Sequence, residues 1–282
     1  MLSNNIILNK LKEKEKEKIN NYTIDVNFIF PEIGCNANCS YCLQKGKYKI
    51  NQNIDIIPLL KSSVNKILDL AKKENRIVNI LLMGGELKIL SDDKQIEIVD
   101  FFRKIRETES NVNRIVLFVN DTKLDSPIMN MEFAQYNIHA INWKNKKLPK
   151  LSKNKFYTVI ITDDITKKDI EFFLKLNTEN EIIFRFDTFS KADKKVQDEM
   201  IEFLDKEKTF NKNLGRKIAF DRKQRMYLCR NKDNKNYSIN FSNGKGILDY
   251  CCNGHMTIPL DDLKTLEFPN IKCPKDCISH FF

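Results

Sequence analysis

The sequence predicts an α/β fold: a partial (β/α)6 barrel of the TIM type, followed by a small cysteine-rich extension with a β-hairpin and a short helix. Short runs rich in Ile, Val and Phe alternate with longer segments of helical period, as in successive βα units around a parallel sheet. This alternation ends near residue 207. The cysteines form one group near residue 40 and another beyond residue 228, with none between them.

The elements of the predicted barrel follow from this alternation. The expected strands are Ile24–Phe30, Val78–Met83, Arg114–Val119, Ile138–Trp143, Tyr157–Thr162 and Ile182–Asp187. The expected helices are Ile56–Lys73, Lys94–Glu107, Ile128–Tyr136, Lys167–Leu176 and Ala192–Lys206. Strand counting alone does not separate a partial barrel from an open Rossmann-type sheet. In both folds, ligands bind at the carboxyl ends of the strands.

The chain divides into three expected parts: an N-terminal helical extension (1–23), the barrel (24–206) and the cysteine-rich extension (207–282). The first part contains Leu11–Lys18, where Lys and Glu alternate and opposite charges support an exposed helix. In the last part, Tyr237–Phe241 and Ile247–Cys251 flank an Asn-Gly turn, which predicts a β-hairpin. A short helix is expected over Leu260–Leu266.

The composition narrows the class of protein. Of the 282 residues, 41% are hydrophobic and 30% are charged, which is ordinary for a globular protein and argues against disorder. No apolar run has the roughly 18 residues of a membrane span, and no secretory signal is recognisable. We therefore expect a cytoplasmic protein without a membrane partner. The net charge of +10 is spread along the chain, so it does not favour nucleic acid as a partner.

The first cysteine group is a compact set of metal ligands. Cys35, Cys39 and Cys42 lie directly after the first expected strand, separated by three and then two residues. A structural zinc site usually needs a fourth ligand, commonly from paired knuckles. Three thiolates in one short loop suit a cubane iron–sulfur cluster, which keeps one iron open. A zinc loop is the alternative interpretation.

The motif Cys-x3-Cys-x-Tyr-Cys resembles the signature of the radical S-adenosylmethionine (SAM) superfamily, Tyr41 being its aromatic residue. The second expected strand is followed by Gly84-Gly85-Glu86, which resembles the family motif that holds the methionine amino group of SAM. The resemblance covers residues 24 to 190. It implies that the three cysteines hold a [4Fe–4S] cluster and that SAM binds its open iron. The reduced cluster would then cleave SAM to a 5′-deoxyadenosyl radical.

Other positions match the family more faintly. Asn120 fits a Thr-Asn-Gly motif after the third strand, although Asp121 replaces its glycine. The resemblance also implies contacts from Asn142 to SAM and from Arg185 to a carboxylate. For Asn142, Arg185 and Asp187 the alternative is an ordinary polar residue of a strand or strand end. The three histidines are scattered, and none is assigned a role.

The second cysteine group resembles the SPASM and Twitch extensions that hold auxiliary clusters in radical SAM enzymes. The implied ligands of a second [4Fe–4S] cluster are Cys229, Cys251, Cys273 and Cys277. The first spacer is longer than usual and the last pair is C-x3-C in place of C-x2-C. Zinc is the alternative metal, because four thiolates suit it equally.

Cys252 is the cysteine left over. It is either a small buried residue or a catalytic hydrogen-atom donor that quenches a substrate radical, as in peptide epimerases that it resembles.

The resemblance predicts an enzyme that modifies a ribosomally made peptide, by epimerisation or by crosslinking. A small-molecule dehydrogenase, with the auxiliary cluster as electron acceptor, is the main alternative. Nucleic-acid modification and a zinc-stabilised binding module are further alternatives. The chemistry requires an electron donor of the flavodoxin or ferredoxin type.

Overall fold

The computed structural model describes residues 23–37, 39, 42, 50–51, 54–186, 198–204, 218–220, 236–249 and 257–266. Several predictions of the sequence lie outside these residues: the N-terminal helical extension, Tyr41, Asp187, Cys229, Cys251, Cys252, Cys273 and Cys277. No helix within the described ranges has the length and apolar character needed to cross a bilayer.

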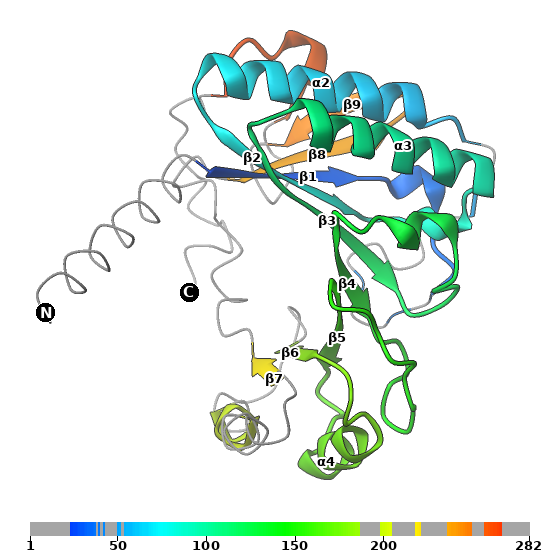
Figure 1. The fold of residues 1–282 in the computed structure, drawn as a ribbon. Coiled ribbons are helices and arrows are strands. Elements are labelled where there is room, and N and C mark those ends of the chain that lie inside the picture. Colours follow the sequence, from blue (N-terminus) through cyan, green and yellow to red (C-terminus); the bar gives the residue numbers. More distant parts are fainter. Residues whose placement is uncertain are drawn as a thin grey trace, which may run out of the picture.

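The strands form one curved sheet with the order β10-β9-β8-β1-β2-β3-β4-β5-β6-β7 (Figure 1). They are β1 (Thr23–Ile29), β2 (Ile77–Met83), β3 (Val112–Asn120), β4 (Gln135–His139), β5 (Lys155–Ile161), β6 (Ile182–Phe186), β7 (Ile218–Phe220), β8 (Asn236–Ser242), β9 (Lys245–Asp249) and β10 (Thr257–Pro259). From β1 to β7 each strand pairs in parallel with the next. The predicted α/β class and parallel βα order are confirmed, and the fold is a partial barrel.

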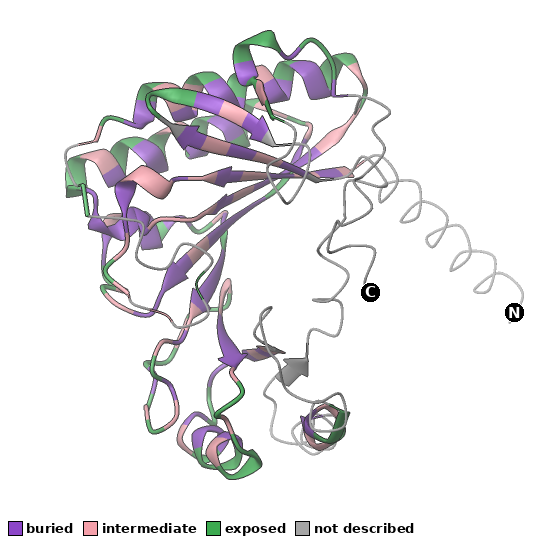
Figure 2. Ribbon diagram, turned by 180° about the vertical axis from the view of Figure 1, so that it is seen from behind, coloured by how far each residue is buried: buried purple, intermediate pink, exposed green. Residues whose placement is uncertain are grey.

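The helices of this barrel lie on the convex face of the sheet (Figures 1 and 2). They are α2 (Ile57–Lys73), α3 (Asp92–Thr108) and α4 (Lys167–Leu176), and residues 198–204 are also helical. Thr166 begins α4 with a capping box that it forms with Asp169. These helices match the predicted ranges within two residues, and 198–204 falls inside the predicted Ala192–Lys206.

The two faces of the sheet differ in chemistry. Residues that point to the helices are apolar and buried, for example Phe28, Leu82 and Leu117. The alternate positions form the concave face, and many of them are polar: Asn27, Asn79, Asn120, Asn137, His139, Thr158 and Arg185. Because side chains alternate along a strand, one face builds the core and the other is left for polar contacts.

Between β3 and β5, one predicted helix is wrong and one predicted strand has the wrong bounds. The helix expected over Ile128–Tyr136 is a 3-10 turn, η3 (Pro127–Asn130), followed by β4. Tyr136 belongs to β4. Its hydroxyl donates to the Ile128 carbonyl at 2.8 Å and so holds the turn against the strand.

The strand expected over Ile138–Trp143 ends at His139. Asn142 then adopts the left-handed conformation (φ 50°), which Asn tolerates and which breaks the strand. Trp143 is buried beyond the turn, where its Nε1 donates to the Ile160 carbonyl.

The predicted hairpin is confirmed as β8 and β9, which pair antiparallel around Asn243 and Gly244. Both turn residues have positive φ (52° and 69°), as a type I′ turn requires. The hairpin is not separate from the sheet, because β8 pairs in parallel with β1. The helix expected over Leu260–Leu266 is wrong: it shortens to the 3-10 turn η6 (Leu260–Asp262).

Backbone hydrogen bonds join the loops that follow β1 and β2. The Phe30 amide donates to the Gly84 carbonyl at 2.7 Å, and the Glu86 amide donates to the Gly34 carbonyl at 2.8 Å. Gly85 lies between these contacts with φ 80°, and a Cβ atom there would lie 2.1 Å from the Phe30 carbonyl oxygen. Glycine is therefore required at this position by backbone packing.

We predict that Gly85→Ala destabilises the fold far more than Gly244→Ala. Both positions have positive φ, which costs alanine about 1–2 kcal/mol. Gly244 has open space around its Cα, whereas Gly85 adds a clash with backbone, worth a further ~1–3 kcal/mol. Urea unfolding of the two variants measures the difference. Equal losses of unfolding free energy would contradict the close approach at Gly85.

Candidate functional site

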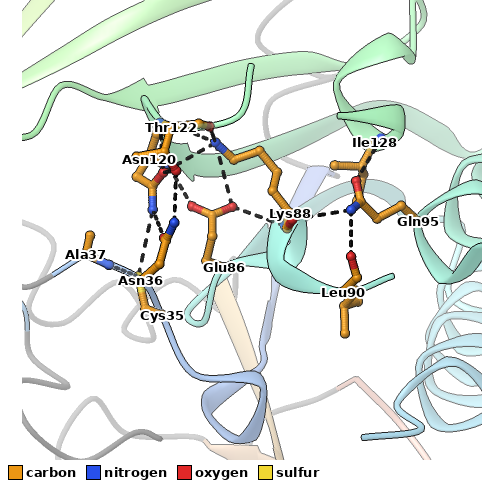
Figure 3. A network of polar contacts seen from close by, with 10 residues as sticks. All are labelled: Cys35, Asn36, Ala37, Glu86, Lys88, Leu90, Gln95, Asn120, Thr122 and Ile128. Atoms are coloured by element: carbon orange, nitrogen blue, oxygen red, sulfur yellow. Dashed lines mark hydrogen bonds and ion pairs between the residues drawn. The ribbon is translucent and has the colours of Figure 1, made fainter. Parts of the chain in front are cut away.

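The candidate site lies where the first strands end at one edge of the sheet. Cys35 follows β1, Glu86 follows β2, Asn120 ends β3 and His139 ends β4. Strands β1 to β4 pair in parallel in chain order, so their carboxyl ends lie side by side and bring these positions together. Ligands of α/β folds bind at the carboxyl ends of the strands. Figure 3 shows that Cys35, Glu86 and Asn120 approach one another from two loops and the end of β3.

The cysteine loop begins with the 3-10 turn η1 (Pro31–Ile33) and Gly34, whose φ is 81°. The Sγ of Cys35 accepts hydrogen bonds from the Ala37 amide at 3.4 Å and from Nδ2 of Asn120 at 3.9 Å. Burial raises the pKa of the Cys35 thiol, and the charge of Glu86 raises it further against these two donors.

The other two cysteines of the loop lie close to each other in the chain. Cys39 is half-buried and Cys42 is exposed, and the Cys42 amide donates to the Cys39 carbonyl at 3.1 Å. In residues 23–37, 39, 42 and the other described ranges, no three His, Cys, Asp or Glu side chains form a ready metal-binding group. The donor set nevertheless fits an iron–sulfur cluster in its chemistry: three thiols in one short loop, with amide donors aimed at the first.

Glu86 is a deeply buried carboxylate of the site, with 2% of its surface exposed. Its Oε2 accepts the Asn120 amide at 2.7 Å, and its Oε1 accepts the Lys88 amide at 3.3 Å. Burial raises the pKa of Glu86, and the nearby ammonium of Lys88 opposes this shift. Each carboxylate oxygen can accept a second hydrogen bond, so capacity remains for a ligand.

Lys88 brings a buried ammonium to the same place. It lies in the 3-10 turn η2 (Leu87–Ile89), and its Nζ is 4.0 Å from Oε1 of Glu86. The Nζ donates to the carbonyl of Asn120 at 2.6 Å and to the carbonyl of Thr122 (Figure 3). Burial lowers the pKa of Lys88, while Glu86 and Asp121 favour its charged form.

Asn120 connects this ammonium to the cysteine loop. Its Oδ1 accepts from the Thr122 amide at 3.0 Å, while its Nδ2 donates to Oδ1 of Asn36 at 2.7 Å. Asn36 in turn donates to the Thr122 hydroxyl at 3.0 Å. The side-chain amide of Asn120 therefore has a fixed orientation, with its NH2 group toward Asn36 and Cys35.

Asp121 occupies the place where the resemblance expects glycine. Its carboxylate is fully buried, and its Oδ2 accepts from Nζ of Lys146 at 2.7 Å. Lys146 lies in the segment after β4, so this ion pair joins the ends of β3 and β4. The departure from the family pattern thus has a structural use in this chain.

The structure brings together some of the predicted site residues and not others. Cys35, Gly84, Gly85, Glu86 and Asn120 share one hydrogen-bonded region. Asn142 is exposed in the turn after β4, and no hydrogen bond in the described ranges links it to this region. Arg185 lies on β6 and faces the concave side, opposite Ile160 in the register.

Lys88 and His139 belong to the site but were not assigned to it from the sequence. Lys88 could have been noticed as a charged residue inside an otherwise apolar Leu-Lys-Ile-Leu run, which is unusual for a surface lysine. His139 is placed beside Asn120 by the β3–β4 register. The alternation Tyr-Asn-Ile-His could have shown that it shares a face with Asn137.

Comparison with known proteins gives matches in structure alone. No family model matches the chain, and no curated protein matches its sequence. The structure of Streptococcus suis SuiB bound to S-adenosylmethionine is 11% identical with a TM-score of 0.51, and the match covers 90% of this chain and 65% of SuiB. Native anSMEcpe with bound AdoMet is 12% identical with a TM-score of 0.60, covering 92% of this chain and 82% of that one.

A histidine-tagged form of anSMEcpe with bound AdoMet gives a similar result, with 14% identity and a TM-score of 0.59. This chain therefore spans somewhat less than two thirds of SuiB and about four fifths of anSMEcpe. Both neighbours are structures with bound S-adenosylmethionine (AdoMet), and the likeness shows that this chain shares their fold.

We predict that His139 makes the fold acid-sensitive. Burial, and then the positive charge of Arg185, lower the pKa of His139 from 6.5 to about 4. As pH falls from 6.5 to 4, the unfolded chain binds a proton there that the folded chain does not, so the free energy of unfolding decreases, by ~1–3 kcal/mol. Urea unfolding at pH 7 and pH 5 measures this loss.

In His139→Gln the loss between the two pH values should be smaller by that amount. Arg185→Gln removes the repelling charge and should reduce the loss in part. A wild-type-sized loss in His139→Gln would show that other groups cause the acid sensitivity.

Proposed function

We propose that this chain, which has the fold of the radical SAM enzymes, is itself a radical SAM enzyme. One observation carries the proposal. Two backbone hydrogen bonds, from the Phe30 amide to the Gly84 carbonyl and from the Glu86 amide to the Gly34 carbonyl, hold the start of the cysteine loop beside Gly-Gly-Glu at the carboxyl ends of β1 and β2. Motifs about 45 residues apart in the chain thus share one site.

In the proposed site, Cys35, Cys39 and Cys42 hold a [4Fe–4S] cluster through their thiolates. When bound, the cluster supplies the electron that cleaves SAM to methionine and a 5′-deoxyadenosyl radical. Glu86 accepts hydrogen bonds from the methionine ammonium with its remaining lone pairs. Asn120 keeps its NH2 group on the Cys35 sulfur. The buried apolar residues on the helix-facing side of the strands exclude water from that side of the site.

We further propose that the substrate is a peptide and that it binds along the concave face. Amide side chains dominate the polar residues there, including Asn27, Asn79 and Asn137. An amide side chain combines a donor and an acceptor, the two groups that a peptide backbone requires. Those of Asn27 and Asn79 also donate within the sheet, to the Tyr237 carbonyl at 3.1 Å and to Oδ1 of Asp25 at 2.6 Å. A small-molecule dehydrogenase remains the second candidate, since a polar alcohol would use the same groups.

The auxiliary cluster belongs to the proposal as well. Its ligands would be Cys229, Cys251, Cys273 and Cys277. The electron donor of the enzyme would be a protein of the flavodoxin or ferredoxin type. The β8–β9 hairpin supports this arrangement, because it reverses the chain between the first two of these cysteines. It also anchors this part of the chain to β1 of the barrel.

We predict about eight irons per chain after anaerobic purification and reconstitution, and about four in a Cys35→Ala/Cys39→Ala/Cys42→Ala variant. SAM cleavage, followed as 5′-deoxyadenosine by chromatography, should occur in the wild type and be lost in the variant. A variant of Cys229 and Cys251 is the matched control, since it should lose iron and keep SAM cleavage. Zinc in place of iron at the first group would contradict the proposed function.

We predict that Cys252→Ser abolishes peptide epimerisation and leaves SAM cleavage intact, because serine cannot donate a hydrogen atom from a weak S–H bond. The measurement is deuterium uptake at the α-carbon of a product peptide in D2O. Cys251→Ser, which would lose a cluster ligand and its iron, separates the two neighbouring thiols. Full turnover of Cys252→Ser would assign this residue to packing and favour crosslinking.

A further inference from the structure

Lys88 is a buried charge that the motifs of the site do not require. It is 2% exposed, and its chain neighbours Leu87 and Ile89 are buried apolar residues. Burying an ammonium is costly, and an ion pair with Glu86 seldom does more than offset that cost. Stabilisation of the fold alone is therefore a weak reason for a lysine here.

The hydrogen bonds of Lys88 converge on the turn that carries Asn120. Its Nζ donates to the carbonyl of Asn120 at 2.6 Å, approaches Oδ1 of Asn120 at 3.4 Å, and also donates to the carbonyl of Thr122. These contacts fix both the backbone and the oxygen end of the Asn120 side chain. With Oδ1 held between Lys88 and Thr122, the NH2 group must point the other way.

The NH2 group points to the cysteine loop, at 2.7 Å from Oδ1 of Asn36 and 3.9 Å from Sγ of Cys35 (Figure 3). An unbroken series of contacts thus leads from the buried ammonium to the first proposed cluster ligand. Glu86 closes the arrangement, because it accepts the amides of both Asn120 and Lys88.

We propose that Lys88 is a positioning residue that holds the Asn120 amide on the Cys35 sulfur and so raises the reduction potential of the cluster. This inference rests on the proposed function. Hydrogen bonds to cysteine sulfur and nearby positive charge both stabilise the reduced cluster, which carries one more negative charge. The lysine therefore makes the cluster easier to reduce by the electron donor.

The test is a redox titration of the reconstituted full chain, followed by the EPR signal of the reduced cluster. The auxiliary ligands Cys229 and Cys251 are replaced by Ala in every sample, so that one cluster gives the signal. Lys88→Met should shift the midpoint potential to a more negative value. Lys88→Arg keeps the positive charge, so its potential should stay close to that of the background protein. Lys94→Met is the matched control, because Lys94 also donates to a backbone carbonyl, that of Ile54 at 2.8 Å, outside this network.

A double-mutant cycle separates positioning from simple loss of charge. Asn120→Ala should shift the potential in the same direction as Lys88→Met. If Lys88 acts through Asn120, the double variant should show clearly less than the sum of the two single shifts. Fully additive shifts would mean that the ammonium acts through space, and would overturn the positioning role.

The outcomes distinguish this inference from the proposed function. Failure of the background protein to bind any cluster would overturn both. A bound cluster whose potential is the same in Lys88→Met and in the background protein would overturn the inference alone. Should Lys88→Met fail to fold, Asn120→Ala still decides, since an unchanged potential there removes the contact on which the inference depends.

Discussion

The backbone contact between the loops after β1 and β2 is the constraint on which the site depends. Phe30 and Gly34 belong to the first loop, and Gly84 and Glu86 belong to the second, so each loop fixes the other without any side chain. The cost is conformational: Gly34, Gly84 and Gly85 all have positive φ, and Gly85 leaves no room for a Cβ atom. The position of Cys35 follows from this contact, and so does the direction in which the Glu86 side chain points into the buried site.

A buried polar network then fixes the third strand relative to the first two. Glu86 and Lys88 extend from the second loop and reach the end of β3 through the backbone of Asn120 and Thr122. Asp121 and Lys146 continue the series to the segment after β4. Because carboxylates and ammonium groups alternate along it, each buried charge has an opposite neighbour, which is the condition under which such groups are tolerated inside a protein.

The sequence was sufficient to predict the parts of this fold that depend on local pattern. The alternation of apolar runs predicted β1, β2 and β3 within two residues, and the capped α4 at its observed bounds. The cysteine spacing and Gly-Gly-Glu placed the candidate site at the strand ends where the structure brings these two motifs together. What failed depends on tertiary contacts. The local pattern around Tyr136 is compatible with a helix or a strand. The hydrogen bond from its hydroxyl to the Ile128 carbonyl forms only in the folded chain, so the sequence does not reveal it.

Lys88 shows the same limit for the site, since a lysine in an apolar run does not indicate which carbonyl groups will accept its hydrogen bonds.

The two-residue period of the strands explains why so much of the fold was nevertheless predictable. On each strand one set of positions, such as Phe28 and Leu82, faces the helices and determines whether the sheet forms. The other set, such as Asn137 and His139, faces the concave side and is free of that requirement. Substitution in the first set therefore changes stability before chemistry. In the second set, polar residues can change without removing the apolar contacts between the sheet and its helices, so one architecture can carry different sites.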